Sequence, residues 1–218
     1  MSVEQPAVRG DSQVETFASV LAAVGEGAIL ALAAGEIQPD PTSFADDGYD
    51  AAGEHSRTAP DKRTIVGIGL NVATAVERLW AKRIVHRDIK PANIVKAATD
   101  RFVLVDVGLA RHLDRSALTA PGAAPCTPGY ASPEQALGRR NLTINSDVFS
   151  LGVTLYEIGT GIHPFNRAQN LVGVISPRPI QLIRRDLDGP LAALISQMMA
   201  VSPAARPSAI RSRFEQVP

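Results

Sequence analysis

A short polar loop beside two runs of β-branched and apolar residues constrains the fold of this chain most strongly. The loop, residues 86–93, reads His-Arg-Asp-Ile-Lys-Pro-Ala-Asn and leads directly into the apolar residues 94–96. A second apolar run, residues 102–105, follows a short polar stretch, so the two runs are predicted to pair as an antiparallel hairpin. We expect Asn93, which enters the first strand, to lie opposite Asp106, which leaves the second. Amide and carboxylate oxygens placed together in this way suit Mg²⁺.

Helical periodicity dominates the chain from Arg63 onward. A helix ending near residues 82–83 is predicted by apolar residues at helical spacing, namely Ile65, Ile68, Val72, Ala75, Val76 and Leu79. A second helix is expected to begin near residues 145–147, each a competent N-cap residue. Further helices are expected at about residues 191–200 and, shorter, within residues 204–214.

The first 60 residues differ in composition and are rich in Ala, Gly, Asp and Glu. Apolar spacing predicts a helix from residue 14 to about 23, and residues 28–32 fit either a strand or a continuation of that helix. Residues 38–60 have the composition of a loop. No lysine occurs before Lys62.

Composition argues against several classes of protein. The 22 basic and 22 acidic residues give no net charge, so the sequence offers no electrostatic reason to expect a nucleic acid or an anionic membrane as partner. The single cysteine, Cys126, excludes an internal disulfide and suits a reducing compartment. The apolar run at residues 28–34 is too short to span a bilayer, and the first residues lack the pattern of a signal peptide. We expect a cytoplasmic protein.

Five motifs together resemble the large C-terminal lobe of the protein kinase family, in its bacterial Ser/Thr branch. They are residues 86–93, Asp106-Val107-Gly108, residues 127–134 (Thr-Pro-Gly-Tyr-Ala-Ser-Pro-Glu), residues 147–152 and Arg206-Pro207. The resemblance implies an α+β, kinase-like fold with a mostly helical large lobe at residues 61–218. Residues 1–60 would then be the remnant of a truncated small lobe followed by a hinge-like loop.

The same resemblance implies the roles of the site residues and the use of ATP and Mg²⁺. Asp88 would orient the hydroxyl of a protein substrate and accept its proton, while Lys90 would contact ATP and neutralise charge on the phosphoryl group. Asn93 and Asp106 would hold Mg²⁺. Thr127 would contact Asp88 and Lys90 from the side on which the substrate binds.

An activation segment is implied as well. Arg87 resembles the arginine that binds a phosphorylated activation segment through a bidentate phosphate contact. Ser116 and Thr119 are the candidate phosphorylation sites, and the alternative that they are solvated loop residues stays open.

Three residues have structural roles by the same resemblance. Glu134 and Arg206 would form a buried ion pair, and Asp147 would accept hydrogen bonds from the backbone of the 86–93 loop. His86 is expected to be packed rather than catalytic.

The first part of the chain departs from the family pattern. Residues 25–27 (Gly-Glu-Gly) are the only early match to a glycine-rich phosphate loop, but they lack its third glycine, and a helix-ending turn is the favoured interpretation. Glu15 fits the glutamate that usually pairs with a lysine, but no lysine precedes residue 62, so a solvated helix acid is the favoured interpretation. Val107 occupies a position where the family usually has Phe.

Two hypotheses follow for the function. The first is a Ser/Thr protein kinase homologue that transfers the γ-phosphate of ATP. The alternative is a pseudokinase or truncated fragment that acts as an interaction module without efficient ATP binding. In that case missing strands would expose apolar surface, and a partner could cover the incomplete small lobe.

Overall fold

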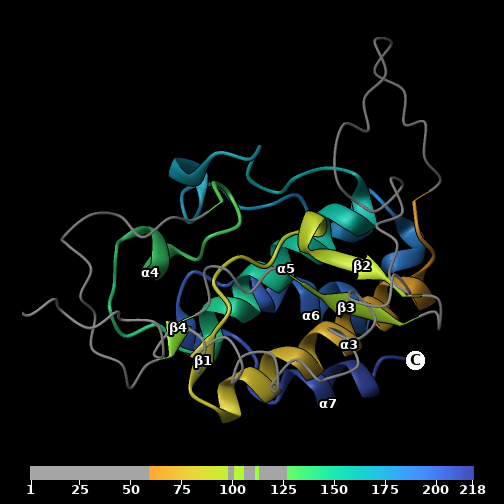
Figure 1. Cartoon of the computed structure of the whole chain (residues 1–218). Coiled ribbons are helices and arrows are strands. Elements are labelled where there is room, and N and C mark those ends of the chain that lie inside the picture. The colour runs from red at the N-terminus through yellow and green to blue at the C-terminus, as the bar shows by residue number, and fades with distance from the viewer. Residues whose placement is uncertain (1–58, 98–100, 106–110, 113–126) are drawn as a thin grey trace, which may run out of the picture.

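The computed structural model describes residues 59–97, 101–105, 111–112 and 127–218. Within these ranges the chain is mostly helical, with two small antiparallel sheets, so the predicted α+β class is confirmed (Figure 1). The α-helices there are α3 (Lys62–Ala81), α4 (Pro133–Ala136), α5 (Ile144–Thr160), α6 (Pro190–Met198) and α7 (Ile210–Glu215). The strands are β1 (Ile84–Val85), β2 (Ile94–Lys96), β3 (Phe102–Leu104) and β4 (Arg111–His112). Single 3-10 turns occur at η1 (Pro91–Asn93), η2 (Gln169–Leu171), η3 (Ile180–Leu182), η4 (Arg185–Leu187) and η5 (Pro203–Ala205).

Helix α3 confirms the first predicted helix. It begins after Asp61, whose side chain caps it by accepting a hydrogen bond from the Thr64 amide at 2.8 Å. The predicted apolar stripe is buried at Ile65, Ile68, Val72, Val76 and Leu79. Gly69 lies on the same face, where a Cβ atom would come within 2.3 Å of Cε1 of Phe214 in α7. The missing side chain at Gly69 therefore lets α7 pack directly against α3.

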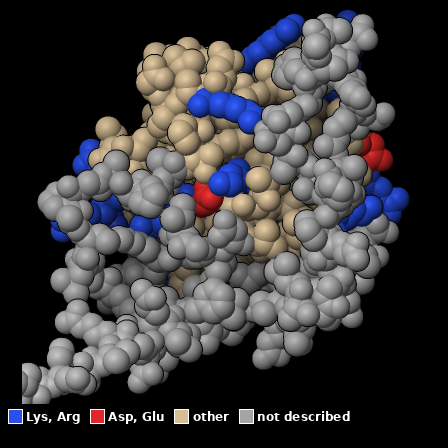
Figure 2. Space-filling view, turned by 45° about the horizontal axis from the view of Figure 1, so that its top comes forward, with Lys and Arg blue, Asp and Glu red and all other residues tan. Residues whose placement is uncertain are grey.

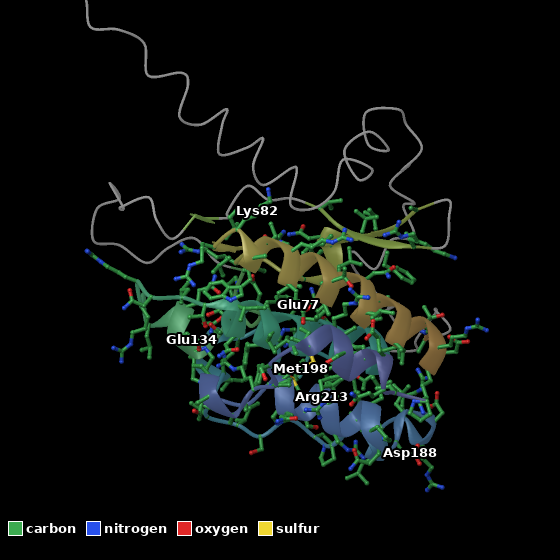
Figure 3. The ribbon with its side chains drawn as sticks, turned by 90° about the horizontal axis from the view of Figure 1, so that it is seen from below. Glu77, Lys82, Glu134, Asp188, Met198 and Arg213 are labelled. Carbon is green, nitrogen blue, oxygen red and sulfur yellow. The ribbon has the colours of Figure 1, made fainter. Side chains whose placement is uncertain are left out.

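Helix α5 crosses the centre of the molecule and packs against both α3 and α6 (Figure 1). It begins slightly earlier than predicted, because Thr143 is the N-cap and its hydroxyl accepts from the Asn145 amide. Every residue from 146 to 160 is buried, so the helix is covered on all sides rather than on one apolar face. A Cβ atom at Gly152 would lie 2.8 Å from Cβ of Met198, which Figure 3 labels on α6.

The predicted hairpin is confirmed, with its register shifted by one residue at the open end. Strands β2 and β3 pair Ile94 with Leu104, and the Val105 amide donates to the Asn93 carbonyl at 2.8 Å. Asn93 therefore lies opposite Val105, and the expectation that it faces Asp106 is wrong. Strand β1 pairs separately with β4.

The C-terminal helices agree with the sequence in number but not in extent. Helix α6 covers most of the predicted 191–200 segment. The helix predicted within residues 204–214 is confined to α7, preceded by the turn η5. Arg206 between them is extended, with φ −75° and ψ 150°, because it precedes Pro207 and a proline disfavours helical geometry in the residue before it.

Several expectations lie outside the described residues. These are the helix at residues 14–23, the segment at residues 28–32, the metal ligand Asp106, and Ser116 and Thr119. Among the helices that the structure does describe, none is long and apolar enough to cross a membrane.

Candidate active site

The loop at residues 86–93 connects β1 to β2 and is held in an unusual backbone conformation. Arg87 has φ 75°, a left-handed value that is uncommon for a residue with a side chain. This conformation is held by Asp147 of α5, whose Oδ2 and Oδ1 accept hydrogen bonds from the backbone amides of His86 and Arg87 at 2.8 and 2.9 Å, respectively. Gln135 of α4 adds a third contact, donating Nε2–H to the Arg87 carbonyl at 2.8 Å. Two helices thus hold the strained residue next to Asp88.

The Asp147 carboxylate that accepts these hydrogen bonds is buried, with the residue 1% exposed. Burial raises its pKa to about 6, even though the backbone hydrogen bonds from Arg87 and His86 favour the ionised form. At neutral pH the side chain is therefore ionised and can accept both amide hydrogen bonds. His86 is fully buried, in keeping with the packing role predicted for it.

Asp88, Lys90 and Thr127 form a closed set of contacts. Lys90 Nζ lies 2.8 Å from Asp88 Oδ2 and donates to Thr127 Oγ1 at 2.9 Å. The Thr127 hydroxyl in turn donates to Asp88 Oδ1 at 2.5 Å. Both carboxylate oxygens of Asp88 are therefore held in place by side chains 2 and 39 residues away in sequence.

The electrostatic balance at Asp88 favours its charged form. Burial opposes ionisation, but hydrogen bonds from Lys90 and Thr127 outweigh it, so the pKa of Asp88 lies below the ordinary value. The carboxylate is only 6% exposed, and it is charged at neutral pH. Such a group can orient a hydroxyl and accept its proton when the oxygen attacks an electrophile.

Asn93 completes the site and offers one ligand for a divalent cation. Its Nδ2 donates to the Asp88 carbonyl at 2.7 Å and to Asp88 Oδ2 at 3.1 Å. Because both donations use the nitrogen, Oδ1 is the amide atom that Asn93 could offer to a cation, which fits the preference of Mg²⁺ for oxygen. The described residues contain no group of three or more His, Cys, Asp or Glu that could hold a metal. Asp106, the second magnesium ligand predicted from the sequence, lies outside the described residues.

Glu134 and Arg206, predicted as an ion pair, lie 2.7 Å apart between Oε1 and Nη1. Figure 3 labels Glu134 on α4, and Ser146 near the start of α5 donates to its Oε1. Burial opposes ionisation of Glu134, but the hydrogen bonds from Arg206 and Ser146 prevail and lower its pKa. The Arg206 guanidinium also lies 4.9 Å from the centre of the Phe149 ring. The pair joins α4, which holds Arg87, to the C-terminal part of the chain.

Figure 2 shows more basic than acidic side chains on one face of the described residues. One reason is that four acidic residues are used as internal hydrogen-bond acceptors, namely Asp88, Glu134, Asp147 and Glu157.

Some residues of the site were missed in the sequence. Gln135, Gln169 and Glu157 all bind the loops around Asp88 through contacts that join distant parts of the chain. No local signal marks an amide or carboxylate for such a role. The predicted roles of Arg87, Ser116 and Thr119 in an activation segment stay predictions.

Comparison with known proteins agrees with this geometry. A model of the protein kinase domain matches residues 49–216. The serine/threonine-protein kinase AfsK of Streptomyces griseus is 35% identical over 155 residues, which is 67% of this chain and 18% of AfsK. The serine/threonine-protein kinase PknD of Mycobacterium tuberculosis is 34% identical over 148 residues, which cover 65% of this chain and 22% of PknD. PknB of Mycobacterium leprae is 48% identical over 83 residues, 38% of this chain and 13% of PknB.

The chain spans about a fifth or less of the length of these relatives. The matched region contains the loop with Asp88, the Thr127 segment and the Glu134–Arg206 pair. The chain therefore belongs to the protein kinase family, in the branch of the bacterial serine/threonine kinases.

Proposed function

We propose that the chain transfers the γ-phosphoryl group of ATP to a serine or threonine hydroxyl of a protein, with residues 61–218 as its large catalytic lobe. The contacts around Asp88 support this most strongly, since Lys90 and Thr127 hold both of its carboxylate oxygens at 2.8 and 2.5 Å. A carboxylate fixed in one orientation beside a cation can position a hydroxyl for in-line attack. We also propose a cytoplasmic location, which the single cysteine favours.

The reaction needs little covalent chemistry from the protein. The hydroxyl oxygen forms a bond to the γ-phosphorus, the bond from that phosphorus to the bridging oxygen breaks, and ADP leaves. Asp88 takes the hydroxyl proton, and Lys90 offsets the negative charge of the phosphoryl oxygens. Asn93 Oδ1 and Asp106 would hold Mg²⁺, which neutralises phosphate charge when bound.

Regulation by phosphorylation belongs to the same proposal. Arg87 lies next to Asp88, and its backbone is held by Asp147 and Gln135. A phosphate on Ser116 or Thr119 would pair with the Arg87 guanidinium and so join the activation segment to the catalytic loop.

The absence of lysine before residue 62 favours a second candidate, an interaction module with weak ATP binding. Within this chain no early lysine is present to contact the nucleotide phosphates. The two candidates differ in whether Mg-ATP binds and whether phosphate is transferred.

Label transfer from γ-³²P-ATP separates the two. The purified chain is incubated with Mg-ATP and a generic protein substrate, beside Asp88→Asn and Asp186→Asn, whose carboxylate is exposed and pairs with Arg184 away from the site. A kinase predicts transfer that Asp88→Asn lowers by about 10²- to 10⁴-fold and that Asp186→Asn leaves unchanged. Absence of both transfer and thermal stabilisation by Mg-ATP would instead support the interaction module.

A further inference from the structure

Residues 127–130 form a tight turn next to Asp88. The Tyr130 amide donates to the Thr127 carbonyl at 3.2 Å, with Pro128 and Gly129 in the central positions. Gly129 has φ 84°, and a proline followed by a glycine of positive φ is typical of a type II turn. Thr127 is the first residue of this turn, so the turn fixes the backbone that carries its side chain. Since Thr127 contacts Asp88, any group that holds this turn affects the orientation of that carboxylate.

The side chain of Gln169 holds the turn at two points. Its Oε1 accepts from the Gly129 amide at 2.9 Å, and its Nε2 donates to the Ala131 carbonyl at 2.9 Å. These contacts satisfy backbone groups on either side of Tyr130, as a neighbouring strand would. Gln169 itself is 38 to 40 residues away in sequence.

Gln169 is presented by a rigid segment. His163 Nδ1 accepts from the amides of Phe165 and Arg167, both at 3.0 Å, which organises residues 163–167 into a compact turn. A Cβ atom at Gly129 would lie 2.8 Å from His163 Cε1 and 2.9 Å from Arg167 Cα. The two segments therefore touch directly, and this contact places Gln169 beside the turn.

A second contact joins the same two segments through Glu157. Its carboxylate accepts a hydrogen bond from the buried Tyr130 hydroxyl and pairs with Arg167 at 2.9 Å. This contact binds the side chain of Tyr130, whereas Gln169 binds the backbone of the 127–130 turn at Gly129 and that of the following residue, Ala131. Gln169 is thus the link that acts directly on the backbone that carries Thr127.

We propose that Gln169 is a positioning residue for phosphoryl transfer, acting through the 127–130 turn and Thr127 on the carboxylate of Asp88. This role rests on the kinase activity proposed above. Gln169 holds the Thr127 hydroxyl where it donates to Asp88 Oδ1, so its loss lowers turnover without removing a group from the reaction centre.

Gln169→Met tests this, because methionine keeps the length of the side chain and removes both hydrogen bonds. The matched control is Gln197→Met on α6, which removes an amide that donates to the Ala205 carbonyl at 3.3 Å. In the Gln169 variant we expect kcat to fall about tenfold or more with KM for ATP unchanged. Gln169→Glu keeps the acceptor for the Gly129 amide and loses the donor to Ala131, so its kcat should lie between that of wild type and that of Gln169→Met. The Gln197 variant should match wild type.

A double-mutant cycle tests the route through Thr127. If Gln169 acts through this hydroxyl, Gln169→Met has little further effect on kcat in a Thr127→Val background. Full additivity of the two losses would overturn the proposal, as would equal effects of Gln169→Met and Gln197→Met.

Two NMR measurements decide the proposal even if wild type transfers no phosphate. Gln169→Met should speed amide exchange at Gly129 about five- to tenfold. It should also shift the Thr127 methyl resonance, because the Thr127 hydroxyl would no longer be held against Asp88. An unchanged Thr127 methyl resonance in this variant would refute the positioning role. Absence of transfer by wild type would refute only the kinase activity.

Discussion

Replacing Arg206 with methionine tests how much the buried ion pair stabilises the fold. The guanidinium is fully buried and makes two contacts with Glu134, at 2.7 and 3.0 Å. It also donates to three backbone carbonyls, those of Asn145, Ala200 and Val201. Methionine fills most of the volume and replaces none of these hydrogen bonds. The substitution therefore leaves Glu134 without its cation and removes the Arg206 donor from each of the three carbonyls.

The expected loss in the free energy of unfolding is about 3–5 kcal/mol, the range for removing one partner of a buried pair. The Glu134 side chain is 16% exposed and can regain some hydration, which favours the lower end of that range. Because the pair lowers the pKa of Glu134, its contribution is present above the ordinary value of 4.5 and is lost as pH falls through the folded pKa. The difference between wild type and variant should therefore narrow in acid.

Urea unfolding followed by circular dichroism measures this loss. Arg211→Met is the matched control, since Arg211 pairs with Glu215 one helical turn away and the two side chains are 53% and 45% exposed. Its loss should be about 0.5 kcal/mol or less. A loss below about 1 kcal/mol for Arg206→Met, or losses of equal size in the two variants, would refute the reasoning.

Two further substitutions test other parts of the fold. Gly69→Ala should destabilise the protein by about 1–3 kcal/mol, because its methyl group would overlap the Phe214 ring, and Phe214→Leu should recover part of that loss in urea unfolding. Burial lowers the pKa of His163 to about 4 from 6.5, so the contribution of His163 to stability is fully present above pH 6.5 and is lost as pH drops towards 4. This loss should amount to about 2 kcal/mol after allowance for solvent screening. In His163→Gln this contribution is absent, so the stability difference between wild type and variant should shrink as pH drops from 6.5 towards 4. Asp147 has a raised pKa, so its contribution to stability falls as pH rises from about 4 to 6, in wild type and variant alike. It therefore cancels when the stability of His163→Gln is subtracted from that of wild type at each pH. A stability difference that does not change with pH would contradict the assignment to His163.

Most regular elements of the described residues were predictable, since their signals are local. The apolar stripe from Ile65 to Leu79 predicts α3, because helical spacing and burial coincide along a single face. Helix α5 was less easily predicted, since it is buried on all sides and its periodicity carries less information. The hairpin was predicted, but its register was not. Asn93 lies opposite Val105 because Ile94 pairs with Leu104, and side-chain alternation alone does not define this register to one residue.

The site was predicted only where residues are close in sequence or follow a family motif. Asp88, Lys90 and Asn93 lie within one loop, so their meeting follows from the loop itself. Gln135 and Gln169 are different, because their contacts span 48 and 40 residues. An amide side chain is equally at home on a solvated surface, and only the packed fold shows that these two bind the backbone beside Asp88.

The rate of phosphoryl transfer in wild type relative to Asp88→Asn tests the central claim most directly. Asparagine keeps the shape of Asp88 and its contact with Thr127 but cannot take a proton from the substrate hydroxyl. With Mg-ATP in excess and equal unfolding midpoints for the two proteins, we predict that wild type transfers label and that the variant is slower by about 10²-fold or more. Equal rates in two folded proteins would contradict the assignment of Asp88 as the group that orients and deprotonates the hydroxyl.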